Sequence, residues 1–297
     1  MNPIRYRVRH ATVYRYSEVV SVSHNVVRLA PADRGGQRCL RHELTVSPTP
    51  AVSASREDAF GNRVGSFTVQ ESHTELTVRA VSEVEVRAAT LPVITPPWEV
   101  VRDRVRAAAD PAALAASEFR FDSPLVPTGS EAAAYAAPSF TPGRPLGAAL
   151  IDLTTRIHHD FAYASGATSI ATPIAEVLRE RKGVCQDFAQ VMIACLRSLG
   201  LSAHYISGYL DTGRGEKGGD KLVGADASHA WVAAFCPGAD GDWLHLDPTN
   251  DCLASDRHIV VAAGRDFSDV SPIKGIIFGG GPHTISVAVE VVRIVGH

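Results

Sequence analysis

Several features that mark other classes of protein are absent from this sequence of 297 residues. No apolar run approaches the roughly 20 residues that a membrane-spanning helix needs, and the N-terminus lacks the apolar region of a secretory signal peptide. The net charge of −3 and the pI of about 6.5 show no basic excess for nucleic-acid binding. We therefore expect a cytoplasmic protein with no nucleic-acid or membrane partner.

Cysteine is scarce, and its positions follow no metal-binding pattern. No CxxC pair occurs, so a structural zinc site is not expected, and unpaired thiols fit a reducing compartment. We predict no metal and no cofactor. The five cysteines are Cys39, Cys185, Cys195, Cys236 and Cys252.

Residues 1–90 carry the period-two pattern of β-strands. In IRYRVRHATVYRY, apolar side chains alternate with basic or polar ones, so one face of the strand is buried and the other is wet. The pattern returns in HELTVSPTP, VGSFTVQES and TELTVRAVSEVEVR, with glycine-containing turns at 33–36 and 61–62. These short strands predict a small antiparallel β-domain.

A proline-rich stretch, LPVITPP, opens the next segment, and proline does not sit in a central strand. We predict a linker over 91–146 with one helix over 98–118. The remainder, 147–297, mixes helical and strand periodicity and is predicted to form a second domain, which strands at 257–263 and 283–295 close. The predicted fold class is therefore α+β.

One predicted helix of the second domain carries a cysteine at its start. Apolar residues over 184–199 follow a single helix face. Cys195 lies on that face and is expected to be buried, whereas Cys185 lies off it in the first turn. Unpaired N–H groups with partial positive charge there stabilise a thiolate, which is the nucleophilic form of the side chain. The same N–H groups can bind a developing oxyanion.

A cysteine nucleophile also needs a base and a group that orients the base. His229 opens a strand-like run and Asp247 ends the next one. Two neighbouring antiparallel strands would place these side chains at one rim, facing the helix start. His245 is a rival base because it lies two residues before Asp247 on the same strand, and Asp251 is the nearest alternative acid.

The motifs GVCQDFAQ, SHAWVAAF and WLHLDPTN, in this order, resemble the core of the transglutaminase-like superfamily of papain-type cysteine enzymes. The opening Y-x-V-x-H-x-T-x-Y-x-Y and the D-x-FGN turn resemble the β-domain that precedes this core in bacterial members. The resemblance implies a papain-like, transglutaminase-core fold with Cys185 as nucleophile, His229 as general base and acid, and Asp247 as orienter. The calcium sites of the large animal members have no counterpart in this sequence. The candidate substrate contacts are Tyr163, Gln186 and Trp231.

The implied chemistry is acyl transfer on amide bonds of a peptide or protein through a thioester. Water as acceptor gives a peptidase or amidase, whereas an amine gives a transglutaminase, and we favour hydrolysis. Two alternatives stay open: an acyl-group transferase resembling the arylamine acetyltransferases, and a non-catalytic protein-binding module. The glycine-rich segment 211–227 is predicted to be a lid over the cleft. The sequence does not predict an oligomeric state.

Overall fold

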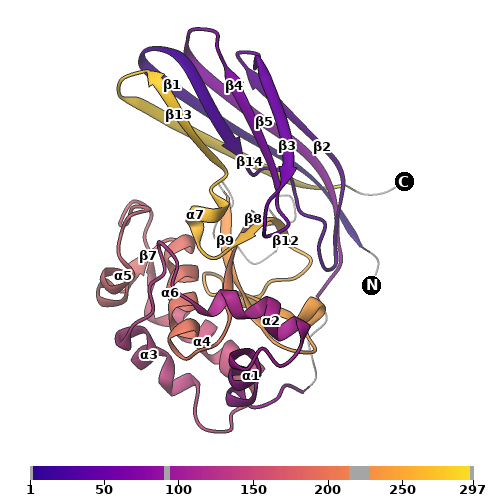
Figure 1. The fold of residues 1–297 in the computed structure, drawn as a ribbon, viewed down its shortest axis with the longest axis vertical. Helices are drawn as coiled ribbons and strands as arrows, with labels where there is room; N and C mark the ends of the chain where they lie inside the picture. Colours follow the sequence, from indigo (N-terminus) through magenta and orange to yellow (C-terminus); the bar gives the residue numbers. More distant parts are fainter. Residues whose placement is uncertain (1–2, 90–93, 214–227, 295–297) are drawn as a thin grey trace.

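The structure is a computed structural model that describes residues 3–89, 94–213 and 228–294. A β-rich part stacks on a mixed part of helices and strands (Figure 1). Most of the predicted lid over 211–227 lies outside the described residues. No helix among the described residues is long and apolar enough to cross a membrane.

The β-rich part is an antiparallel sheet built around one long strand, β1. Tyr6 and Val8 are buried in the apolar cluster that also contains side chains of helix α6 (Cys185–Ser198), while Arg5 and Arg7 stay in contact with solvent, as the period-two pattern predicts. The strand order is β2-β5-β1-β4-β3. These strands are β1 (Ile4–Val27), β2 (Gln37–Ser47), β3 (Val52–Glu57), β4 (Arg63–Val69) and β5 (His73–Val86).

The last two strands of the chain also belong to this sheet. Strand β13 (Ile273–Gly279) and strand β14 (His283–Ile294) both pair antiparallel with β1, and they run beside it in Figure 1. The prediction that the strand at 283–295 closes the second domain is therefore wrong. Alternating hydrophobicity identifies a strand, but it does not identify the free edge with which that strand pairs.

The second part holds an antiparallel sheet in the order β11-β10-β9-β8-β12, and helix α6 (Cys185–Ser198) packs against β8 and β9. Further helices surround α6 (Figure 1). The strands are β8 (Ala203–Leu210), β9 (His229–Phe235), β10 (Trp243–Asp247), β11 (Cys252–Leu253) and β12 (His258–Gly264). The helices are α1 (Trp98–Arg106), α2 (Pro111–Ser117), α3 (Ser130–Ala136), α4 (Leu146–Asp160), α5 (Ile174–Glu180) and α7 (Phe267–Val270), and a short parallel pair joins β6 (Ala162–Tyr163) to β7 (Lys182–Gly183).

The segment predicted as a linker with one helix contains three helices, α1 to α3, and is part of the core. Val101, Val105, Ala116 and Phe140 are buried in the same apolar cluster as α6. Proline at the first position of α2 begins that helix rather than breaking it, with the Asp110 side chain as its N-cap. Pro97, Pro111 and Pro145 therefore stand at the starts of helices α1, α2 and α4 rather than in an extended linker.

Helix α6 has the buried face that its sequence predicts. Phe188, Met192 and Leu196 are at most 1% exposed, and Cys195 is fully buried. Near the end of the helix, the buried Arg197 guanidinium donates to the carbonyl oxygens of Phe119, Ala203 and Arg265 and to the Ser123 hydroxyl. These bonds satisfy the buried cation without a carboxylate in direct contact and fix α6 against its surroundings.

Two side-chain amides of the β-domain, from Gln37 and Asn62, bind the backbone at the free edge of β12 and so join the β-domain to the core. The Asn62 amide accepts from the Ala263 N–H and donates to the Ala263 carbonyl oxygen, both at 2.8 Å. The Gln37 amide pairs with both backbone groups of Val260 in the same way, each at 2.7 Å. Each amide thus stands in for a peptide group of a missing neighbour strand, so the edge of the core sheet is closed by the β-domain.

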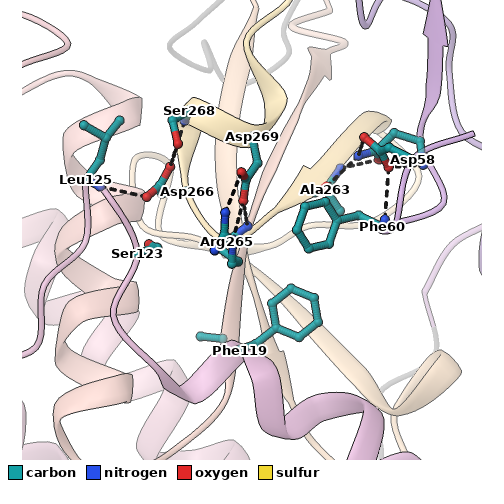
Figure 2. Close-up of polar contacts among 12 residues, drawn as sticks. Asp58, Phe60, Phe119, Ser123, Leu125, Ala263, Arg265, Asp266, Ser268 and Asp269 are labelled. Carbon is teal, nitrogen blue, oxygen red and sulfur yellow. Dashed lines mark hydrogen bonds and ion pairs between the residues drawn. The ribbon is translucent and has the colours of Figure 1, made fainter.

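Figure 2 shows the D-x-FGN turn against the core, with the Phe60 ring beside Arg265 and Phe119. The rings of Phe60 and Phe119 lie 6.0 Å apart, and the Arg265 guanidinium lies 6.0 Å from the centre of the Phe60 ring. Asp269 holds Arg265 by an ion pair of 2.8 Å. The turn that the sequence singles out is therefore a docking element between the two parts of the chain.

Candidate functional site

Cys185 is the first residue of α6, and the side chain of Asp187 fixes the start of that helix. The Asp187 carboxylate accepts the Val184 N–H at 2.8 Å and the Thr168 hydroxyl at 2.6 Å. The Cys185 side chain is partly exposed. Cys195, by contrast, is fully buried, and burial raises the pKa of its thiol to about 12. Of these two thiols, only Cys185 can meet a substrate.

His229 and Asp247 lie at the adjoining ends of neighbouring strands, β9 and β10. The His229 ring donates from Nε2 to Oδ2 of Asp247 at 2.8 Å, and both residues are at most 1% exposed. The other ring nitrogen, Nδ1, is buried and makes no hydrogen bond of ordinary geometry among the described residues. Because Cys185 interacts with this imidazole, Nδ1 is the atom left to exchange a proton with the thiol.

The electrostatics of the pair favour a charged imidazole. Burial by itself lowers the pKa of His229, but the Asp247 charge, its hydrogen bond and the interaction with Cys185 outweigh burial and raise that pKa to about 10. Burial works to raise the pKa of Asp247, yet His229 and the other donors hold it well below its usual range. The carboxylate therefore stays ionised, and the arrangement suits a thiolate–imidazolium pair.

The Asp247 carboxylate is held on both oxygens. Oδ1 accepts the backbone N–H groups of Thr249 at 2.9 Å and Asn250 at 3.2 Å. Oδ2 accepts the Asn250 side-chain amide at 2.7 Å in addition to His229. The DPTN sequence thus forms a turn whose own N–H groups orient the carboxylate towards β9, which gives the motif a structural reason.

His258, which the sequence analysis does not single out, also contacts Asp247. Its Nε2 lies 3.1 Å from Oδ2 of Asp247, and its ring is 5% exposed. The ligand atoms of His229, Asp247 and His258 lie within 4.8 Å of one another, which is a spacing that a metal ion could use. The hydrogen bonds of His229 and His258 to Asp247 account for the short distances among these three side chains. The absence of a metal stays a prediction. No motif marks His258, so its sequence offers no signal.

The two rival residues have other partners. His245 accepts the indole N–H of Trp231 at 3.1 Å, and burial, with His258 adding to it, lowers the pKa of His245 to about 4. Asp251 is exposed and accepts the Thr155 hydroxyl at 2.7 Å. Neither residue forms the hydrogen bond that His229 and Asp247 make with each other.

The three candidate substrate contacts differ in exposure. Tyr163 is 41% exposed and pairs with Gly183 close to the start of α6, and burial together with the nearby Cys185 raises the pKa of its phenol. Gln186 is partly exposed in the first turn of α6. Trp231 is fully buried, with its ring 6.1 Å from the His229 ring. The expected substrate contact by Trp231 is therefore wrong, because the indole supports the imidazole from behind.

Comparison with known proteins places this arrangement in a family. Residues 6–85 match the bacterial transglutaminase-like N-terminal region, and residues 136–248 match the transglutaminase-like superfamily. An uncharacterized protein of Mycobacterium tuberculosis (strain ATCC 25618 / H37Rv) is 45% identical over 300 residues, which span 98% of this chain and 94% of that protein. An uncharacterized protein of Mycobacterium leprae (strain TN) is 32% identical over 305 residues, which span 98% and 99%.

A solved structure shares the fold. The crystal structure of a "putative cysteine protease" from Cytophaga hutchinsonii matches with a TM-score of 0.74 at 20% identity, covering 100% of this chain and 93% of that chain. The predicted fold class, a papain-like transglutaminase core preceded by an antiparallel β-domain, is thereby confirmed. The chain belongs to the transglutaminase-like superfamily, among the bacterial members that carry this N-terminal β-domain.

Proposed function

We propose that this protein transfers acyl groups from amide bonds through a thioester on Cys185, and that its main reaction is hydrolysis of a peptide or isopeptide amide. The observation that carries the proposal is the buried His229–Asp247 pair, whose imidazole interacts with the partly exposed Cys185 thiol at a helix start. A nucleophile must meet its substrate, whereas the groups that activate it interact more strongly away from water. The proposed substrate is a peptide or protein.

In the proposed reaction, the Cys185 thiolate attacks the amide carbonyl carbon, which forms a C–S bond and a tetrahedral oxyanion. Unpaired N–H groups in the first turn of α6 are the proposed oxyanion donors. The His229 imidazolium then protonates the amine as the C–N bond breaks, leaving a thioester and a neutral imidazole. A water molecule, deprotonated by His229, attacks the thioester; the C–S bond then breaks, which releases the carboxylic acid product and restores the thiolate–imidazolium pair.

Asp247 keeps the imidazole in the tautomer that this cycle needs. Its bond to Nε2 leaves Nδ1 free to exchange a proton with the thiol, and its charge stabilises the imidazolium that forms. Tyr163 and Gln186 are proposed to contact the substrate from either side of Cys185. All five cysteines are unpaired, which suits a reducing compartment, so we also propose a cytoplasmic location.

Alkylation by iodoacetamide tests the activated thiol without knowledge of the substrate. We expect Cys185 to react at neutral pH roughly 10-fold or more faster than Cys195, because only an exposed thiolate is alkylated rapidly. The His229→Ala variant should lose this fast reaction. Slow and equal labelling of the two cysteines would remove the proposal and favour a non-catalytic binding module.

Product analysis then separates the reactions. A glutamine-containing peptide is incubated with the protein, with and without a primary amine. A free carboxylate in both mixtures, released with ammonia from the glutamine side chain or with a new amine where the backbone is cut, indicates hydrolysis, whereas an amine-linked product indicates transamidation. Acylation of Cys185 by a small thioester donor, with no reaction of the peptide, would instead support an acyl transferase resembling the arylamine acetyltransferases.

A further inference from the structure

His258 is placed so that it donates to the Asp247 carboxylate as a neutral ring. Its Nδ1 accepts the Ser255 backbone N–H at 3.3 Å, so the proton of the neutral imidazole resides on Nε2, which faces Oδ2 of Asp247 at 3.1 Å. Burial lowers the pKa of His258, which keeps the ring uncharged near neutral pH. The charge of Asp247 is therefore left to balance His229 alone.

The charged and titratable groups around His258 are few. Asp247, His229, Arg257 and His245 interact with it electrostatically. Asp247 is the only one of these to which the described structure gives it a hydrogen bond. His258 is a second histidine on the same carboxylate oxygen that His229 contacts, and such donors help to fix the orientation of the carboxylate, as the groups behind metal-bound histidines do.

The strand that carries His258 is held from outside by the β-domain. Gln37 pairs with both backbone groups of Val260, two residues beyond His258. The Tyr6 hydroxyl donates to the Asp256 carbonyl oxygen at 3.0 Å, two residues before it. Both contacts come from strands that lie outside the catalytic core in sequence, so the β-domain sets the position of the first residue of β12.

We propose that His258 is a positioning residue for the Asp247–His229 pair, and that the β-domain holds it in place through Gln37 and Tyr6. The inference rests on the proposed function of Cys185. It gives the β-domain a role inside the catalytic mechanism: the domain keeps the carboxylate aimed at the imidazole and, through it, the imidazole aimed at the thiol.

The test compares pH profiles of Cys185 alkylation by iodoacetamide in the full chain, with the thermal unfolding midpoint recorded for each variant. The His258→Leu variant removes the donor, and His258→Gln keeps an N–H at a similar reach. The His204→Leu variant is the matched control, because His204 is also a buried histidine, lies on β8 and has no hydrogen bond to Asp247 in the described structure. The Gln37→Leu variant tests the link to the β-domain.

We expect His258→Leu to alkylate about 10-fold more slowly at pH 7, a typical effect of losing a supporting hydrogen bond behind a reactive group, and to move the midpoint of the profile to higher pH. His258→Gln should recover most of the rate. Gln37→Leu should move the midpoint of the pH profile in the same direction as His258→Leu, but by less. His204→Leu should lower the unfolding midpoint and leave the pH profile unchanged.

Two results would overturn the inference. One is a His258→Leu profile that coincides with that of the unmodified chain. The other is an equal shift in His204→Leu, which would mean general loosening of the core. If His258→Leu does not fold, the His258→Gln and Gln37→Leu profiles decide by the same comparison. Failure of the proposed function looks different, because fast labelling that depends on His229 would then be missing from the unmodified chain.

Discussion

Replacing Asp247 by Asn removes one charge at constant shape, and its cost can be worked out from the hydrogen bonds. The carboxylate is fully buried and accepts N–H groups on both oxygens. An asparagine has one acceptor oxygen and one NH₂ group, so whichever way it turns, two or three buried donors face another donor. Each such unsatisfied group costs about 1–3 kcal/mol, so Asp247→Asn should lower the free energy of unfolding by at least about 2 kcal/mol.

The larger effect falls on the thiol. Without the carboxylate, burial dominates at His229 and moves its pKa down from about 10 to below the ordinary histidine value. The neutral imidazole no longer balances a thiolate. Alkylation of Cys185 at pH 7 should therefore slow by about 10²–10⁴-fold, the range found for the loss of general base catalysis and of its orienting acid.

The pH dependence of stability provides a second readout of the same variant. The pKa of His229 is raised in the folded state, so its contribution to stability is fully present below the unfolded value near 6.5 and is lost as the pH rises towards about 10. In Asp247→Asn this contribution disappears. Urea unfolding between pH 6.5 and 10 should show a shallower decline for the variant than for the unmodified chain.

The matched control is Asp251→Asn, since Asp251 is an exposed neighbour whose carboxylate accepts the Thr155 hydroxyl at 2.7 Å. It should leave the pH profile of alkylation unchanged. Its free energy of unfolding should stay within about 0.5 kcal/mol of that of the unmodified chain. The reasoning fails if Asp247→Asn alkylates at the normal rate with the normal pH profile, or if Asp251→Asn reproduces its effect.

Two other substitutions test separate parts of the structure. His245→Ala should keep most of the fast alkylation of Cys185, because His245 bonds to Trp231 rather than to the thiol. If His245→Ala loses the fast labelling while His229→Ala keeps it, His245 is the base. Asn62→Leu leaves the N–H and the carbonyl oxygen of Ala263 without their partner. Each unsatisfied group costs about 1–3 kcal/mol of stability, so chemical denaturation should show a lower unfolding midpoint. An unchanged midpoint would contradict the docking role of this amide.

Much of the architecture could be predicted from local pattern. The period-two alternation in β1 and the single apolar face of α6 record which side of each element is buried, so both elements follow from the sequence alone. The order of the three motifs identified the family, and the first-turn position of Cys185 predicted an exposed thiol at a helix start. The strand and helix patterns and the place of Cys185 are local because they depend on residues a few positions apart, whereas the motif order is a property of the whole second domain.

Long-range pairing was decided only by the tertiary structure. Strand β14 has the alternation of any strand, and only the free edge of β1 shows where it belongs. Trp231 could face a substrate or the interior, and the packing behind His229 settles which. His258 carries no motif, because its hydrogen bond to Asp247 exists only once β12 and β10 lie in one sheet under the β-domain. Such contacts join residues far apart in the sequence, and the local pattern around one residue does not identify its partner. They are therefore determined by the packing of the whole chain.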